Sequence, residues 1–437
     1  MSDEASFDGR RMTRFVRFVS GERQLFVVVN VVVNMVLLLR SYVTMQVLDY
    51  RGLGVAALLQ TVILLIGTFQ LGFLNGGFRL VCAAEGRELE RINNLIYTYF
   101  GLLLCLSLTV GAVLLVQLDG ADADLVALLG ISGGVLTLVR TWMTNRMVAA
   151  GTFVLLNTIN FFSAVASLAA LLFIPVNPLA ACLAAVVAQP ALFVLAAAVT
   201  DRGQLPTGIE TGGPLVKSVL RAGFVLFLTG IFTQLNTLFE RWYVTAELGV
   251  EALGHLYLAF LFVTLFQLVP TSLDQLYLPS IVRANNDGDR GGVSRGIRQF
   301  FLVVLAYCVM VALALQLAAA PIIELILPEY ISDLRYVYLL ASGLILFALA
   351  GPFAVAFNVV IQYRYYFVAF GTGTVATAAA FLAATLSDGS LNLDAVAGLR
   401  SAIYGLMSVI LFHGYLAISR EFPQFRFGFN RRGGAPS

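Results

Sequence analysis

Two arginines stand inside long apolar segments of this chain, in nearly the same five-residue setting. Arg40 begins the segment Arg40-Ser-Tyr-Val-Thr44, and Arg241 begins Arg241-Trp-Tyr-Val-Thr245 in the second half. A guanidinium binds phosphate oxygens through a planar, two-pronged contact, and charges inside a membrane usually face an interior or a pathway. The pair therefore predicts a cationic cavity for an anionic cargo such as pyrophosphate. The alternative is that both arginines extend to the lipid headgroups.

Polar residues precede each arginine at helical spacing, and those before the second arginine include an acid. Asn30 and Asn34 lie ahead of the first arginine, and Thr233, Asn236 and Glu240 lie ahead of the second. Steps of three, four and seven residues place such side chains on one face of a helix. We predict that the two faces line a hydrated substrate cavity. Hydrogen bonding between helices is the alternative, because it uses the same residue types.

A second group of residues suggests gating or coupling. Asp274 lies four residues after Pro270, and a proline is expected to kink its helix. The corresponding place in the first half is the run 72–77, which contains Gly76 and Gly77 and which we expect to be flexible; Arg79 follows it. Bent or broken helices at equivalent positions in two halves are typical of transporter sites and gates. We predict that Asp274 titrates during transport; the alternative is an acid at the membrane interface that pairs with an arginine.

The residue types needed for enzyme chemistry are missing. The two histidines, His255 and His413, have no nucleophile near them in sequence, and the four cysteines occur singly. The sole lysine, Lys217, does not belong to a phosphate-binding loop. We therefore expect no enzyme activity, no metal site, no cofactor, no ATP hydrolysis and no nucleic-acid partner.

Long apolar segments must position the residues named above. The composition is 59% hydrophobic and 12% charged, which a soluble domain could not keep in water. Crossing a bilayer takes ~20 apolar residues in a helix, and lipid offers no partner to an open backbone. The sequence therefore predicts an all-α, polytopic membrane protein with about twelve transmembrane helices. We place them at 24–48, 52–80, 95–117, 125–148, 152–174, 179–200, 218–245, 252–281, 299–317, 336–363, 365–387 and 395–418.

The loops between these segments alternate in charge. With the N-terminus in the cytoplasm, most of the 27 basic residues fall on the cytoplasmic side, and outer loops are acidic, as at Asp119, Asp122 and Asp124. Because basic residues mark cytoplasmic loops, we expect both termini to be cytoplasmic. The compartment would be the cytoplasmic membrane of a bacterium or an archaeon.

The matching arginine segments indicate an internal duplication. Each begins the outer end of the first helix in a set of six, so both halves would have the same orientation. We expect two six-helix bundles related by a pseudo-twofold axis along the membrane normal, with a cavity between them. The predicted parts are a cytoplasmic N-terminal segment 1–23, bundles 24–200 and 218–418, a Gly/Pro/Thr-rich cytoplasmic linker 201–217 and a cytoplasmic tail 419–437.

Several segments, in order along the chain, carry a resemblance to a known family. They are Gly52-Leu-Gly-Val-Ala-Ala-Leu58, Glu85-Gly-Arg-Glu88, Leu248-Gly-Val-Glu-Ala-Leu-Gly-His-Leu-Tyr-Leu-Ala259, Tyr277-Leu-Pro-Ser-Ile281 and Pro321-Ile-Ile-Glu-Leu-Ile-Leu-Pro-Glu-Tyr330. The chain resembles the polysaccharide repeat-unit (Wzx-type) flippases of the multidrug/oligosaccharidyl-lipid/polysaccharide exporter superfamily. It departs from them at Glu240-Arg241, where family members often have Asp-Arg, and at Pro328-Glu329, where many have glycine before the tyrosine.

The resemblance implies a flippase for an undecaprenyl-pyrophosphate-linked oligosaccharide. By alternating access it would turn this cargo from the inner to the outer leaflet for surface polysaccharides such as O-antigen or exopolysaccharide. The implied partners are the lipid-linked glycan, membrane lipid and polysaccharide polymerase or assembly proteins, and the protein would act as a monomer. Two alternatives remain, an ion-coupled drug or cation antiporter of the same superfamily and a membrane-embedded glycan polymerase or ligase. The polymerase would need a larger outer loop than this sequence has.

Overall fold

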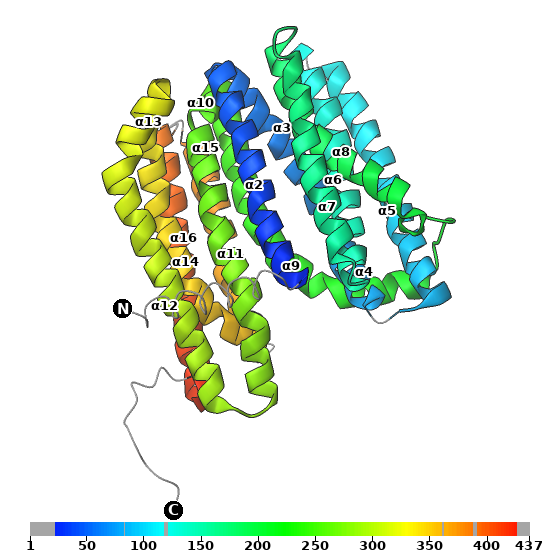
Figure 1. Cartoon of the computed structure of the whole chain (residues 1–437). Helices are drawn as coiled ribbons and strands as arrows, with labels where there is room; N and C mark the ends of the chain where they lie inside the picture. The colour runs from blue at the N-terminus through cyan, green and yellow to red at the C-terminus, as the bar shows by residue number, and fades with distance from the viewer. Residues whose placement is uncertain (1–21, 83, 118–120, 361, 388–390, 426–437) are drawn as a thin grey trace, which may run out of the picture. The chain divides into compact units, whose positions relative to one another are not determined.

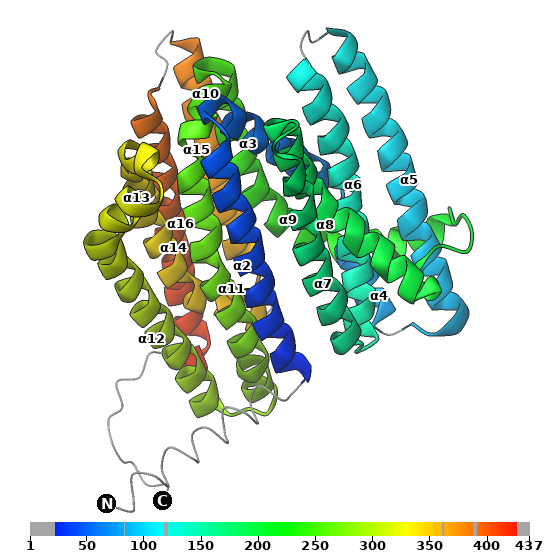
Figure 2. The ribbon, with the colours of Figure 1, turned by 45° about the horizontal axis from the view of Figure 1, so that its top comes forward.

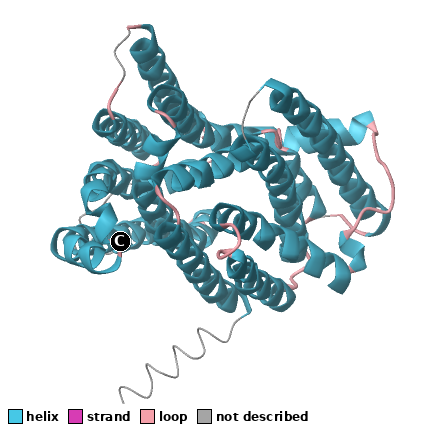
Figure 3. Ribbon diagram, turned by 90° about the horizontal axis from the view of Figure 1, so that it is seen from above, coloured by secondary structure: helices cyan, strands magenta, loops and turns pink. Residues whose placement is uncertain are grey.

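A computed structural model describes residues 22–82, 84–117, 121–360, 362–387 and 391–425 of the chain (Figure 1). The N-terminal segment predicted at 1–23 therefore lies almost wholly outside the described residues, as does the tail from residue 426 onward. Every regular element in the described ranges is a helix, and Figure 3 shows no strand among them.

The contacts divide the chain into two compact units, Met1–Ile231 and Phe232–Ser437. The described helices of unit 1 are α2 (Glu22–Val47), α3 (Tyr50–Thr68), α4 (Phe73–Val81), α5 (Gly86–Gln117), α6 (Ala121–Ala149), α7 (Phe153–Ser167) with the 3-10 segment η1 (Leu168–Phe173), α8 (Pro178–Thr200), η2 (Arg202–Gln204) and the first part of α9 (Gly213–Tyr243).

Unit 2 continues from the rest of α9. Its further helices are the π-helical turn η3 (Val244–Leu248), α10 (Val250–His255), α11 (Tyr257–Asn286), α12 (Arg290–Ala314), the π-helical turn η4 (Leu315–Ala319), α13 (Ala320–Ile326), η5 (Pro328–Asp333), α14 (Leu334–Val359), α15 (Arg364–Leu386), α16 (Leu393–Glu421) and η6 (Pro423–Phe425).

Most of these helices are long enough to span a membrane. Among the described residues, 11 helical segments are long and apolar enough to cross a bilayer. The remaining long helix is α9, with 31 residues, which at 1.5 Å per residue extends for about 46 Å. The predicted all-α, polytopic fold is confirmed.

The two units repeat one order of helix packing. In unit 1, α3 packs on α6, α6 on α5 and α8, and α7 on both α8 and α2 (Figures 1 and 2). In unit 2, α11 packs on α14, α14 on α12 and α16, and α15 on α16. The α2–α7 pair has its counterpart in α9 and α15, where Thr374 Oγ1 donates to the Phe232 carbonyl at 3.0 Å. Each unit therefore packs its helices in the order expected of a duplicated bundle.

The repeated arginine segment also has the same local geometry in both units. Thr44 Oγ1 donates to the backbone carbonyl of Arg40 at 2.9 Å, and Thr245 Oγ1 donates to that of Arg241 at 2.7 Å. Threonine makes such a bond to the carbonyl four residues earlier when it lies within a helix. The two segments therefore match in backbone contacts as well as in sequence.

The predicted span 52–80 is interrupted in the structure. α3 ends at Thr68 and α4 begins at Phe73, and between them Leu71 has φ 47° and Gly72 has φ 87°. A positive φ costs glycine little, which fits the second position. The predicted span 252–281 is divided as well, at Leu256 between α10 and α11. The proline at which we expected a kink, Pro270, lies inside α11 and does not end that helix.

Gly76 and Gly77 lie inside α4 and are positions of close packing. A Cβ added at Gly76 would lie 1.9 Å from the Val219 carbonyl oxygen of α9, and one at Gly77 would lie 2.8 Å from the Trp142 ring of α6. Next to them, Arg79 Nη1 donates to the Ala222 carbonyl of α9 at 3.2 Å. The predicted flexible run is therefore a tight helix crossing, since only glycine allows this approach.

The linker predicted at 201–217 is attached to α5 by hydrogen bonds, and its end is already helical because α9 begins at Gly213. Asn93 Nδ2 donates to the Leu205 carbonyl at 3.0 Å, and Arg91 Nε donates to Glu210 Oε2 at 2.8 Å. The Arg91 bond is the largest effect lowering the pKa of the Glu210 carboxyl. The boundary between the units follows Ile231, inside α9.

Candidate functional site

A partly buried arginine joins four helices inside unit 1. Arg140 of α6 donates from Nη1 to Gln189 Oε1 of α8 at 3.0 Å and from Nη2 to Asn160 Oδ1 of α7 at 2.9 Å. Asn160 in turn donates from Nδ2 to Asn30 Oδ1 of α2 at 3.2 Å. We call these four residues the Arg140 cluster.

The direction of these hydrogen bonds leaves donors over. Because a guanidinium can only donate, the amide oxygens of Gln189 and Asn160 must face Arg140. Gln189 then directs its Nε2 away from Arg140. This residue is only 4% exposed, and its Nε2 has no hydrogen-bond partner among the described residues. Asn157 Nδ2, on α7 and one turn before Asn160, is likewise buried without a partner there. Two buried amide N–H groups, those of Gln189 and Asn157, are therefore left without an acceptor among the described residues.

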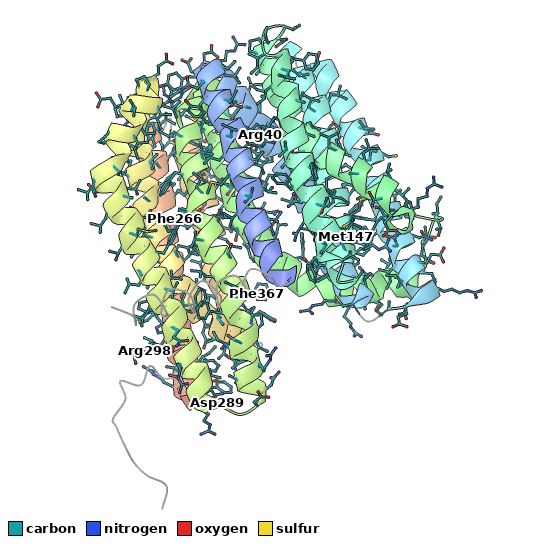
Figure 4. The ribbon with its side chains drawn as sticks, in the orientation of Figure 1. Arg40, Met147, Phe266, Asp289, Arg298 and Phe367 are labelled. Atoms are coloured by element: carbon teal, nitrogen blue, oxygen red, sulfur yellow. The ribbon has the colours of Figure 1, made fainter. Side chains whose placement is uncertain are left out.

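The charge of the Arg140 cluster is positive. No carboxylate of the described residues forms an ion pair with Arg140, whose partners are neutral amides. Arg40 lies within electrostatic range of it and donates from Nη1 to the Ala185 carbonyl of α8 at 3.1 Å, one helical turn before Gln189 (Figure 4 labels Arg40 on α2). Two guanidinium groups therefore contact neighbouring turns of one helix.

The predicted residues of α2 differ in what they contact. Asn30 belongs to the cluster, where it bonds to another helix, whereas Asn34 Nδ2 donates to the Asn30 carbonyl of its own helix at 2.7 Å. The first arrangement is a hydrogen bond between helices, which was the alternative to cavity lining.

Unit 2 contains a buried carboxylate with its own arginine. Glu240 of α9 is only 2% exposed and accepts a hydrogen bond on Oε2 from Arg400 Nη1 of α16. Arg400 also donates from Nη2 to Thr237 Oγ1 at 3.3 Å and to the Tyr404 hydroxyl at 3.0 Å. We call these four residues the Glu240 cluster.

Arg241, the residue after the acid, is buried and does not extend to the protein surface. It is 9% exposed, and its guanidinium carbon lies 4.5 Å from the centre of the Phe260 ring, within the range of a cation–π contact. It lies within electrostatic range of both Glu240 and Arg400. These three groups carry two positive charges and one negative charge, so their sum is positive.

A pocket adjoins the Glu240 cluster. Three α9 residues that we predicted to line the substrate cavity, Thr233, Asn236 and Glu240, lie on its wall. Thr377 Oγ1 of α15 donates to Asn236 Oδ1 at 2.8 Å across its wall. Glu240 Oε1, the second oxygen of the acid, is buried and has no hydrogen-bond partner among the described residues. The polar residues on the pocket wall are Thr233, Asn236, Glu240, Thr377, Arg400 and Tyr404.

Asp274 is half-buried on α11, apart from both clusters. It forms no hydrogen bond or ion pair with the described residues. The alternative, in which Asp274 pairs with an arginine at the membrane interface, therefore has no arginine among the described residues. Tyr366 of α15 lies within electrostatic range, and the Tyr366 hydroxyl is engaged with the Ala354 carbonyl at 3.1 Å and with Asn358 Nδ2 at 3.2 Å.

Sequence reasoning missed Arg140 and Arg400 as site residues and counted them only as evidence for topology. Both stand inside predicted spans, 125–148 and 395–418. A charge inside a span needs a partner or a pathway, so their position was a usable signal. Their partners depend on which helices pack together, and the sequence does not show this.

Comparison of the sequence with protein-family models and with curated proteins finds no match. The structure matches solved transporters over most of its length. The lipid II flippase MurJ, in an inward closed conformation, has a TM-score of 0.71 at 12% identity over 91% of this chain and 90% of its own. An inward-facing multidrug resistance MATE family transporter of the MOP superfamily has a TM-score of 0.66 at 12% identity over 89% and 94%.

The chain therefore shares the fold of these solved structures. The MATE transporter VcmN of Vibrio cholerae agrees, with a TM-score of 0.62 at 15% identity over 92% of this chain and 96% of its own. Fold alone does not separate a flippase from a drug transporter, because MurJ and the MATE proteins both match. The distinction must come from the charges and hydrogen-bonding groups of the two clusters.

Proposed function

We propose that this protein is a flippase for a lipid-linked oligosaccharide whose lipid and sugar are joined by pyrophosphate. It would work by alternating access in the cytoplasmic membrane of a bacterium or an archaeon, for surface polysaccharide assembly. A sugar chain with a pyrophosphate cannot cross hydrocarbon unaided, because its hydroxyls and charges would lose their water. The protein must supply polar contacts while the lipid tail stays in the bilayer.

The observation that carries the proposal is the uncompensated charge of Arg140. Its hydrogen bonds within the described residues go to the neutral oxygens of Gln189 and Asn160. Arg140 is partly buried, and a charge withdrawn from water is costly unless a counter-charge accompanies it. Ionised pyrophosphate offers negative charge and only acceptor oxygens, which suit the amide N–H groups of Gln189 and Asn157 and the nearby Arg40.

A drug or cation antiporter would need the opposite electrostatics. A cationic cargo is stabilised by an ionised acid without a counter-charge of its own. The buried acid of the Glu240 cluster is paired with Arg400, and Arg241 adds a further positive charge within electrostatic range. The described buried clusters therefore favour an anion in unit 1 and disfavour a cation in unit 2.

Binding of a pyrophosphate lipid tests the proposal. For the full-length protein in nanodiscs, we expect Arg140→Gln and Arg40→Gln each to weaken binding of farnesyl pyrophosphate about tenfold or more, since a hydrogen bond to a charged group contributes roughly 1.5–3 kcal/mol. Arg140→Lys should restore binding only in part, because an ammonium keeps the charge but loses the planar fork. Arg241→Ala, tested alongside, shows whether unit 2 also contacts the pyrophosphate. In cells, export of the surface glycan should fall in parallel.

Arg87→Gln is the matched control, because this exposed arginine on α5 belongs to neither cluster. It should bind farnesyl pyrophosphate as the wild type does. Wild-type binding by both Arg40→Gln and Arg140→Gln, at unchanged abundance in the membrane, would show that these arginines only hold helices together. Tight binding of organic cations by the wild type would favour the antiporter instead.

A further inference from the structure

Helix α12 of unit 2 has two faces that differ in exposure. It begins the apolar segment Arg290–Ile326, which is long enough to span a membrane. Steps of three and four residues place side chains on one face of a helix. The buried face holds Val293, Ile297, Phe300, Val304 and Cys308. The same steps on the opposite side join six exposed residues, which we call the α12 stripe: Arg295, Arg298, Leu302, Ala306, Val309 and Leu313.

The α12 stripe changes from charged to apolar along the helix. Arg295 and Arg298 stand at its start (Figure 4 labels Arg298), and Leu302, Val309 and Leu313 follow at 49%, 50% and 55% exposure. Helical side chains point back towards the N-terminus of their helix, so the guanidinium groups extend away from the apolar part. A phospholipid has the same order of groups, a charged headgroup followed by hydrocarbon.

The length of the apolar part also fits a lipid. Eleven residues separate Arg298 from Val309, which corresponds to about 16 Å at the helical rise of 1.5 Å per residue. One leaflet provides half of the ~30 Å hydrocarbon core of a bilayer. An acyl chain beside the stripe therefore extends to Val309 when its headgroup is level with Arg298.

The charges near the start of the stripe favour an anionic headgroup. Besides the two stripe arginines, Arg283 and Arg290 are exposed there, against two acids, Asp287 and Asp289. Asp289 caps its own helix, since its Oδ1 accepts from the Gly292 N–H at 2.8 Å. Guanidinium groups bind phosphate oxygens through a planar fork, and basic clusters next to a membrane span attract anionic lipids.

We propose that the α12 stripe is a binding site for an anionic phospholipid of the surrounding bilayer. Arg295 and Arg298 bind the phosphate of the headgroup, and an acyl chain lies along Leu302, Ala306 and Val309. This lipid is not the transported cargo. The site lies within unit 2 and does not depend on the proposed function.

Helix α15 provides an internal comparison. Its exposed Val375 lies eleven residues after Arg364, as Val309 lies eleven residues after Arg298. The charge of Arg364 is compensated, however, because its Nη2 lies 3.8 Å from Glu421 Oε1. We therefore expect an exposed apolar face at the same depth on α15, without a preference for anionic lipid.

The test uses tryptophan to report which lipid lies beside each helix. Full-length protein carrying Trp242→Phe and either Val309→Trp or Val375→Trp is reconstituted in phosphatidylcholine mixed with brominated phosphatidylglycerol, whose bromine atoms quench tryptophan on contact. The remaining tryptophan, Trp142, is fully buried. With Val309→Trp we expect phosphatidylglycerol to bind about tenfold or more tightly than phosphatidylcholine, because each arginine near a headgroup contributes about fivefold. With Val375→Trp the two lipids should bind about equally.

Removing the arginines of the stripe should remove the preference. Arg295→Gln/Arg298→Gln, added to the Val309→Trp protein, should make the two lipids bind about equally. Arg87→Gln/Arg202→Gln is the matched control, because it removes two exposed arginines from unit 1 and leaves the α12 stripe intact. It should keep the preference, and thermal unfolding should show that both double variants are folded.

Three results would overturn the lipid site. The first is equal binding of the two lipids in the Val309→Trp protein with its arginines in place. The second is an equally strong preference in the Val375→Trp protein, which would show that anionic lipid gathers around the protein without a site. The third is a preference that survives Arg295→Gln/Arg298→Gln or that falls as far in Arg87→Gln/Arg202→Gln, because the stripe arginines would then not be its cause.

Discussion

The two units share one packing order but differ in their buried polar groups. Unit 1 places Arg140 of α6 among neutral amides, and the amide nitrogens of Gln189 and Asn157 lack an acceptor among the described residues. Unit 2 places an acid on α9 against an arginine of α16 and has an acceptor oxygen to spare. The charged residues do not occupy equivalent helices, since the counterpart of α6 in the packing order is α14. The helix packing is therefore repeated in the two units, whereas the buried charged and polar residues differ.

The second helix of each unit also differs. In unit 1 it is interrupted between α3 and α4, and Gly76 of α4 approaches the backbone of α9. In unit 2 the corresponding α11 is continuous, with Pro270 inside it and a half-buried Asp274 one turn later. The second helix of unit 1 is therefore marked by tight packing, and that of unit 2 by an acid that has no ion-pair partner among the described residues.

The largest effect is expected from breaking the ion pair of unit 2. Arg400→Ala leaves Glu240 as a buried charge without a counter-charge, and this should lower the free energy of unfolding by about 3–5 kcal/mol. Arg140→Gln removes a charge whose partners are neutral, so it should cost only about 1–2 kcal/mol, the value of one or two hydrogen bonds. Thermal and denaturant unfolding of the detergent-solubilised protein measures both.

The double variant Glu240→Gln/Arg400→Gln provides the control for that comparison. Because neither charge remains, it should recover most of the stability lost in Arg400→Ala. Equal losses for Arg400→Ala and Arg140→Gln would mean that the two clusters do not differ in charge compensation.

A smaller loss is expected from Gly76→Ala in unit 1. The added Cβ would meet the Val219 carbonyl oxygen at 1.9 Å, so α4 and α9 must move apart. Overpacking of this kind costs about 1–3 kcal/mol. Gly101→Ala is the matched control on α5, where an added Cβ has no atom within 4 Å. It should stabilise the protein by about 0.5–1 kcal/mol through helix propensity, and a loss as large as that of Gly76→Ala would contradict the tight crossing.

These differences show how far the sequence could lead. Long apolar segments and the repeated arginine motif predicted the helices and the duplication, because hydrophobic length is a strong local signal. The partners of Arg140 and Arg400 were missed, because they lie on helices distant in sequence. The role of Gly76 was misread as flexibility, since its neighbour is Val219 on α9. Asn34 was placed on the correct helical face, but it bonds to its own backbone.

The smallest effect on stability, and a specific one on transport, is expected at Asp274. Glu240 is held by Arg400, whereas Asp274 forms no ion pair with the described residues and is only half-buried. We therefore expect Asp274 to be the acid that couples transport to protons, because no guanidinium of the described residues is paired with it. Asp274→Asn keeps the shape but cannot ionise. We expect it to fold normally, to leave lipid-linked oligosaccharide in the inner leaflet and to remove the response of transport to a pH gradient across proteoliposomes.

Glu240→Gln, in the same assay, should keep that response even if its rate falls. A wild-type rate and pH response in Asp274→Asn would make this residue structural, and loss of the response in Glu240→Gln alone would move the coupling to the Glu240 cluster.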